Sequence, residues 1–149
     1  KYEMNINEHE FYMKKAIEQA KIAYENDEVP VGAVIVYNNK IIARSHNLCE
    51  KLIDFTAHAE MQVFTSASNY LQSKYLDKCS LYVTLEPCLM CAGASYWTRI
   101  GKIIFGANDP KKGFRNKSTN VLHPKTTMIG PIMEMECSSI IKSFFYDKR

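Results

Sequence analysis

The chain has 149 residues, a length that favours one domain, residues 1–149, with a core that needs no disulfide staples. Its net charge is modest at +3, and no apolar run approaches the roughly 20 residues that a membrane-spanning helix requires, which argues against a membrane protein. Five cysteines, an odd number, without a secretory apolar segment predict reduced thiols and a cytoplasmic location.

The first elements in chain order are a helix and a hairpin. Asn7 is a suitable cap for a helix that runs to about Asn26, because apolar residues follow it at helical spacing. Two short apolar runs on either side of Asn38-Asn39 then predict a β-hairpin over 33–37 and 40–43. The helix should cover one face of the sheet that this hairpin begins.

Helices and strands then alternate. The predicted elements are a helix over 58–72, a strand over 80–85, a helix over 88–98, a strand over 102–106, a short strand over 128–133 and a helix over 135–148. A hairpin followed by this alternation predicts a mixed sheet with helices on both faces.

Two thiols lie three residues apart where the strand over 80–85 gives way to a helix. Cys88 and Cys91 share one face of the first helical turn, where backbone N–H groups favour thiolates. Upstream, His58 and Glu60 open another helical stretch. Together these segments offer an imidazole, two thiolates and a carboxylate that need not touch a metal.

Ligand count separates catalytic from structural zinc sites. Structural sites have four protein ligands, whereas catalytic sites have three and leave the fourth position to water, whose pKa falls to about 7. His58, Cys88 and Cys91 make three, and Glu60 can take the proton of that water without being a ligand. H-x-E followed by P-C-x-x-C is the signature of zinc nucleobase deaminases.

The spacing of the cysteine pair is also compatible with two other kinds of site. A redox dithiol also has C-x-x-C spacing, but a His-x-Glu helix start is not part of that pattern. A four-ligand structural site would have to recruit Cys49, His46 or Cys79, and none of these is paired with another ligand at ligand spacing.

Beyond this motif, the chain resembles the bacterial tRNA adenosine deaminases of the cytidine deaminase-like superfamily. The segments that carry the resemblance are 29–34, 46–47, 56–60, 81–88, 90–94, 99–101 and 105–107. The resemblance covers nearly the whole chain. It implies an α/β fold, a three-layer α/β/α sandwich with a five-stranded mixed sheet, and a homodimer with active sites near the subunit interface.

The resemblance also implies roles for individual residues. His58, Cys88 and Cys91 would bind zinc, Glu60 would be the proton shuttle, and Asn47 would hydrogen-bond the target base through its amide. The remaining residues implied at the pocket are Val31, Ala33, Leu85 and Glu86, with Asp109 near the nucleic acid and without a chemical role.

The implied reaction is hydrolytic deamination of the wobble adenosine in a tRNA anticodon, which yields inosine and ammonia. An unstacked anticodon loop lets a base be splayed out at low cost. Residues 102–149 have nine Lys and Arg against four Asp and Glu, a net charge of +5. Candidate phosphate contacts in this basic part are Lys111, Lys112, Arg115 and Lys117.

Two alternatives from other classes stay open. Tyr96-Trp97 stand where the tRNA enzymes usually lack aromatic residues, which favours a deaminase of free guanine or cytosine. Two further differences from the tRNA enzymes leave the substrate open. Phe55 stands where the family usually has proline, and the segment 113–127 is shorter than the usual tRNA-contacting region. A zinc-binding structural or RNA-binding module without catalysis is the third hypothesis, and Glu60 argues against it.

Overall fold

A five-stranded mixed sheet lies at the centre of the protein in the computed structural model, which describes residues 2–118 and 120–148, with side chains from residue 6 onward. The elements in chain order are α1 (Tyr2–Glu25), β1 (Gly32–Tyr37), β2 (Lys40–His46), α2 (Cys49–Leu52), α3 (Ala59–Leu71), β3 (Ser80–Leu85), α4 (Leu89–Thr98), β4 (Lys102–Ala107), the 3₁₀ turn η1 (Phe114–Asn116), β5 (Thr127–Ile129) and α5 (Glu134–Asp147).

The strand order β2-β1-β3-β4-β5 explains where the loops meet. β1 is antiparallel to β2 and β3, whereas β3, β4 and β5 are parallel. The carboxyl ends of β3 and β4 therefore point to the same edge, which is where open α/β sheets bind ligands. The segment after β3 carries both cysteines of the motif, and the segment after β4 carries the basic residues.

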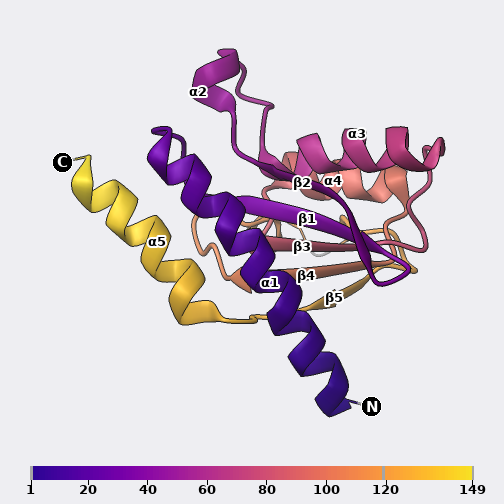
Figure 1. The fold of residues 1–149 in the computed structure, drawn as a ribbon. Helices are drawn as coiled ribbons and strands as arrows, with labels where there is room; N and C mark the ends of the chain where they lie inside the picture. Colours follow the sequence, from indigo (N-terminus) through magenta and orange to yellow (C-terminus); the bar gives the residue numbers. More distant parts are fainter. Residues whose placement is uncertain (1, 119, 149) are drawn as a thin grey trace.

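Helices cover both faces of the sheet (Figure 1). α1 and α5 lie together on one face, whereas α3 and α4 lie together on the other, and α2 lies away from the sheet. The predicted three-layer α/β/α arrangement around a mixed sheet is confirmed. No helix among the described residues is long and apolar enough to cross a bilayer.

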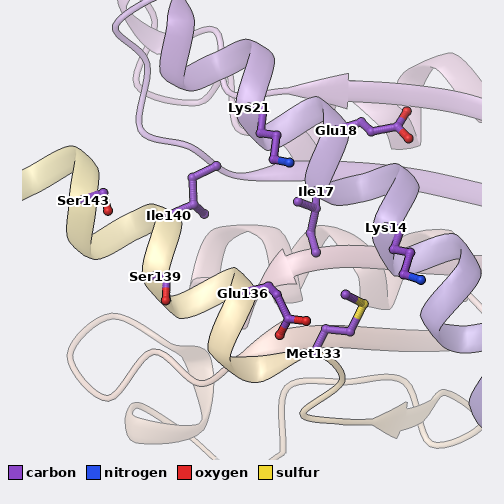
Figure 2. Close-up of a pocket in the computed structure, with 9 residues that line it drawn as sticks. All are labelled: Lys14, Ile17, Glu18, Lys21, Met133, Glu136, Ser139, Ile140 and Ser143. Atoms are coloured by element: carbon purple, nitrogen blue, oxygen red, sulfur yellow. The ribbon is translucent and has the colours of Figure 1, made fainter.

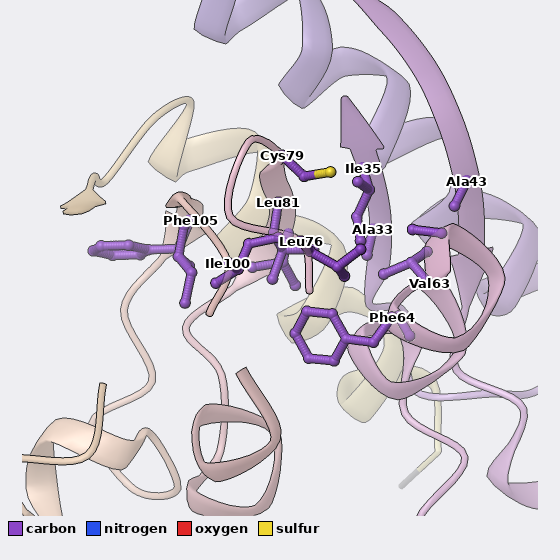
Figure 3. Close-up of a cluster of buried hydrophobic side chains, with 14 of the residues drawn as sticks. Ala33, Ile35, Ala43, Val63, Phe64, Leu76, Cys79, Leu81, Ile100 and Phe105 are labelled. Carbon is purple, nitrogen blue, oxygen red and sulfur yellow. The ribbon is translucent and has the colours of Figure 1, made fainter. Parts of the chain in front are cut away.

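Each face of the sheet packs its own apolar cluster. On the α3 side, Figure 3 shows Phe64 and Val63 of α3 near side chains of β1 and β3, including Ile35 and Leu81. On the α1 side, the cluster joins Met13 and other residues of α1 to β1, β3 and β4. Alternate residues of β1 enter the two clusters, which is why this buried strand is apolar throughout.

The N-terminal end of α1 differs from the prediction. Asn7 does not cap the helix, because α1 already begins at Tyr2 and Asn7 lies exposed within it. A capping residue is only a local preference, and a helix continues through it when the preceding residues also accept helical geometry. The hairpin prediction is confirmed, with positive φ at Asn38 (51°) and Asn39 (61°).

Candidate metal centre

The three predicted ligands meet at the N-termini of two helices. His58 is the residue before α3, and Cys88 is the residue before α4, with Cys91 in its first turn. The Nδ1 atom of His58 lies 3.6 Å from Sγ of Cys88 and 3.5 Å from Sγ of Cys91. All three ligand atoms lie within 4.8 Å of one another.

This spacing fits a tetrahedral zinc ion. Zn–S bonds of about 2.3 Å and Zn–N bonds of about 2.0–2.1 Å, at a tetrahedral angle, place a nitrogen and a sulfur about 3.6 Å apart. The observed distances are 3.6 and 3.5 Å. One imidazole and two thiols are also the borderline-soft donors that zinc prefers.

Within residues 2–118 and 120–148, no fourth His, Cys, Asp or Glu side chain belongs to this group. Nδ1 of His46 lies 3.0 Å from the carbonyl oxygen of Asn47, Sγ of Cys49 lies 3.8 Å from the carbonyl oxygen of Phe55, and Cys79 is buried in an apolar cluster. The donor set therefore has the three-ligand count of catalytic zinc sites.

The two thiols differ in their protonation in the absence of a metal. A hydrogen bond from the Cys91 thiol, followed by the His58 contact, lowers the pKa of Cys88 to about 4 despite its burial. The same hydrogen bond and burial raise the pKa of the Cys91 thiol. These contacts favour the thiolate form of Cys88, and a metal ion bound here would favour it for both cysteines.

Glu60 lies in the first turn of α3, two residues beyond His58, and only 4% of its surface is exposed. Burial raises the pKa of this carboxyl group to about 7. A buried carboxyl group beside a metal-ligand set, but outside it, can hold and release a proton without competing for the metal.

Asn47 contacts the start of α3, the helix that follows the predicted ligand His58. Its Oδ1 accepts a hydrogen bond of 2.8 Å from the backbone N–H of Ala59, the first residue of α3. His58 precedes that helix without making a side-chain cap. Because the N–H of Ala59 needs an acceptor, the orientation of the amide is fixed, and Nδ2 is the atom that remains for a substrate.

The other residues implied at the pocket lie at the ends of strands. The backbone N–H of Asn47 donates to the carbonyl oxygen of Val31, and Ala33, which pairs with Val83 of β3, is fully buried. Leu85 ends β3 and pairs with Ala107 of β4. The Val31 contact places the start of β1 beside the segment that carries Asn47.

Two further buried carboxylates, those of Glu28 and Glu86, accept backbone N–H groups of distant segments, which the sequence does not predict. Glu28 is 1% exposed and accepts the backbone N–H groups of Glu50 and Lys51, which holds α2. Glu86, expected only to line the pocket, faces the segment after β4. No local pattern reveals either role, since the partners lie 22 to 29 residues away.

The acidic and basic residues after β4 differ in the contacts that they make within the protein. The carboxylate of Asp109 accepts the backbone N–H groups of Lys111 and Lys112, so it stabilises a turn. Lys111, Lys112, Arg115 and Lys117 are all exposed, but the guanidinium of Arg115 is also paired with the buried carboxylate of Glu86. The four expected phosphate contacts are therefore not equivalent.

A groove of about 500 Å³ lies elsewhere, between α1 and α5 (Figure 2). Lys14, Lys21, Glu18 and Glu136 project around it, with Ile17 on its floor. None of the predicted ligands lines this groove. Its mixed charges and its distance from α3 and α4 separate it from the metal centre.

Known proteins are similar to this chain in both fold and sequence. A family model for MafB19-like deaminases matches residues 7–149. A tRNA-specific adenosine deaminase of Bacillus subtilis (strain 168) is 44% identical, over 97% of this chain and 92% of its own length.

Two solved structures are also similar. One, from studies of A-to-I editing by tRNA:A34 deaminases, is 40% identical over 87% of this chain and 98% of its own, with a TM-score of 0.79. The other, a guanine deaminase from Bacillus subtilis, is 38% identical over 67% of this chain and 64% of its own, with a TM-score of 0.64. The chain therefore belongs to the MafB19-like deaminase family and is a relative of the tRNA-specific adenosine deaminases.

Proposed function

We propose that this chain is a zinc-dependent hydrolytic deaminase that converts the wobble adenosine of a tRNA anticodon to inosine. The observation that carries the proposal is the juxtaposition of His58, Cys88 and Cys91, at zinc-ligand spacing, with the buried carboxyl group of Glu60. The relatives named above as tRNA-specific adenosine deaminases and tRNA:A34 deaminases support adenosine in tRNA as the substrate.

The residues of the chain perform the proton transfers. When bound, zinc supplies a water of lowered pKa, about 7, and polarises the group under attack. Glu60 accepts a proton from the water that attacks C6 of adenine, then returns protons to the ring nitrogen and to the leaving amine. The C6–N bond breaks, and inosine and ammonia result.

Asn47 orients the base in this proposal. Because its Oδ1 is bonded to the N–H of Ala59, it offers the substrate a donor, Nδ2, which suits a ring-nitrogen acceptor of a purine. Val31 and Ala33, at the start of β1 beside Asn47, are proposed to line the pocket.

Replacing Asn47 by Asp or Ala separates its two contacts. Asn47→Asp keeps an acceptor for Ala59 at a helix N-terminus that favours a carboxylate, but it removes the donor. We expect kcat/KM to fall about tenfold with little change in melting temperature. Asn47→Ala removes both contacts and should also lower the free energy of unfolding by about 1–2 kcal/mol. Full activity of Asn47→Asp would exclude a contact between Nδ2 and the base.

Ammonia release tests the substrate. The zinc-loaded protein is compared on an anticodon stem-loop with a wobble adenosine, the same stem-loop with a wobble guanosine, and free guanine, adenine and cytosine. We expect turnover of the adenosine stem-loop alone, since the unstacked loop presents the base for splaying. Turnover of a free base, with no reaction on the stem-loop, would contradict the proposal.

Deamination of a free nucleobase is the second candidate. The observation that favours it is the 38% identity with a guanine deaminase, together with Tyr96-Trp97 on α4. That match spans 67% of this chain, whereas the tRNA-specific relative spans 97%. The tRNA proposal is therefore preferred, and the ammonia assay decides between the two.

A homodimer belongs to the same proposal. α4 presents a surface with exposed Leu89, Tyr96 and Trp97, of which Trp97 is 77% exposed. A Cβ added at Gly93, on the same helix, would meet no atom within 4 Å, which leaves room for another chain to approach. An exposed apolar surface of this kind is typical of an interface.

The free thiols of five cysteines support a cytoplasmic location.

A further inference from the structure

The carboxylate of Glu86 is buried next to the metal-ligand segment, and the proposed reaction does not use it. Its Oε1 accepts the backbone N–H of Asp109 at 3.0 Å, and its Oε2 accepts the backbone N–H and Nε of Arg115 at 3.3 and 3.1 Å. Three donors from the segment after β4 therefore converge on one side chain from the segment after β3. Burial opposes ionisation, but Arg115 and the two backbone donors hold the pKa of Glu86 below its usual value.

The side chain of Arg115 is 44% exposed, but several contacts with the protein hold its guanidinium. Besides its bond to Glu86, its second guanidinium nitrogen donates to Oδ1 of Asn108. The guanidinium carbon also lies 4.7 Å from the ring centroid of the buried Phe105. The two hydrogen bonds use two of the five N–H donors, and together with the contact to Phe105 they fix the orientation of the planar guanidinium.

The backbone of the same segment lies directly against the metal ligands. Gly113 forms a β-bridge with Cys88, and the N–H of Phe114 donates to the carbonyl oxygen of Pro87 at 2.9 Å. A Cβ added at Gly113 would lie 2.3 Å from Cδ of Glu86, so the fit admits only glycine without rearrangement. Lys112, the residue before Gly113, is exposed, and its positive charge is close enough to His58 to act against the protonation of the imidazole.

We propose that Glu86 and Arg115 are a positioning pair that fixes residues 109–117 beside the metal centre, so that the exposed Lys111, Lys112 and Lys117 face the phosphates of a bound RNA. Arg115 acts within the protein and is not itself a phosphate contact. This inference rests on the proposed function, because it assigns the phosphates to the RNA substrate.

One variant that keeps the charge of its residue and one that removes it separate positioning from direct phosphate binding. Arg115→Lys keeps the positive charge but cannot reproduce the paired and stacked guanidinium. Glu86→Gln removes a negative charge and leaves a single acceptor oxygen for three donors. A direct electrostatic role predicts that Arg115→Lys binds RNA like the wild type and that Glu86→Gln binds it more tightly. The positioning pair predicts that both bind more weakly.

Stem-loop affinity and kinetics give the result. We expect each variant to raise Kd and KM for the anticodon stem-loop about tenfold, with kcat changed much less and with bound zinc unchanged. The double variant should be no worse than either single one, because both remove the same contact. Lys117→Ala, the control, should flatten the salt dependence of binding, whereas Arg115→Lys should not. Wild-type affinity in Arg115→Lys, or tighter binding by Glu86→Gln, would overturn the inference.

Amide hydrogen exchange gives a readout that needs no substrate. In the wild type, the N–H groups of Asp109 and Arg115 are bonded to Glu86 and should be protected, and in Glu86→Gln they should exchange about tenfold faster. Equal exchange in both proteins would refute the positioning pair whatever the substrate is. Faster exchange without wild-type turnover of the stem-loop would instead place the failure in the proposed function.

Discussion

Glu60→Gln should lower kcat for deamination by about 10²–10⁴-fold, the range that a positioned general acid and base contributes. Glutamine has nearly the same size as glutamate, but its amide cannot take a proton from water and return it to the base. The three proposed zinc ligands are unchanged, so we expect metal analysis to find the same zinc content as in the wild type. The same result is expected for Glu60→Ala.

The control for this variant is Glu136→Gln, which alters an exposed carboxylate on α5 and should retain wild-type kcat. If Glu60→Gln keeps most of its activity, Glu60 is not the proton shuttle. If it loses zinc together with activity, the carboxyl group is part of the metal site, and the three-ligand interpretation fails. If the protein is a structural module without catalysis, the wild type should not deaminate any substrate. The same assay therefore distinguishes that hypothesis from the catalytic ones.

Local sequence predicts β1, β3 and β4 to within one residue at each end, whereas β2 extends three residues beyond the predicted 40–43 and β5 covers Thr127–Ile129 instead of 128–133. β3 was expected over 80–85 and is found at Ser80–Leu85, because its apolar run is bounded by polar residues. The hairpin follows from Asn38-Asn39, which accept positive φ. The ligand set is also local, since each half of the motif lies at the start of a helix.

The contacts that position the site are not local. α2 has four residues and ends at Leu52, and Ile53, which follows it, has a φ of 52°; apolar periodicity does not reveal so short a helix. It is held by Glu28, more than twenty residues earlier. The bonds from Asn47 to Ala59 and from Glu86 to Arg115 likewise join segments whose proximity depends on the order of strands in the sheet. Single-sequence patterns therefore identify reacting groups better than the residues that hold them.

Gly32→Ala should lower the free energy of unfolding by about 3 kcal/mol, at the upper end of the cost of overpacking a core. A Cβ at this position would lie 2.0 Å from the carbonyl oxygen of Ala16 and 2.4 Å from the backbone N of Ala20. Both contacts are with the backbone of α1, so no side-chain rotation can relieve them. Urea unfolding of the zinc-loaded protein, with the slope m compared between variants, measures the effect.

The matched control is Gly93→Ala, because both substitutions add one methyl group to a glycine and only the surroundings differ. Gly93 lies inside α4 with nothing within 4 Å of an added Cβ, so alanine should stabilise the helix by about 0.5–1 kcal/mol. The two variants should thus change stability in opposite directions. If Gly32→Ala costs less than about 1 kcal/mol, α1 can move away from β1, and the start of β1 beside Asn47 is not held by helix packing. If Gly93→Ala instead destabilises the protein, and does so more at high than at low protein concentration, the added methyl group lies in a contact between chains.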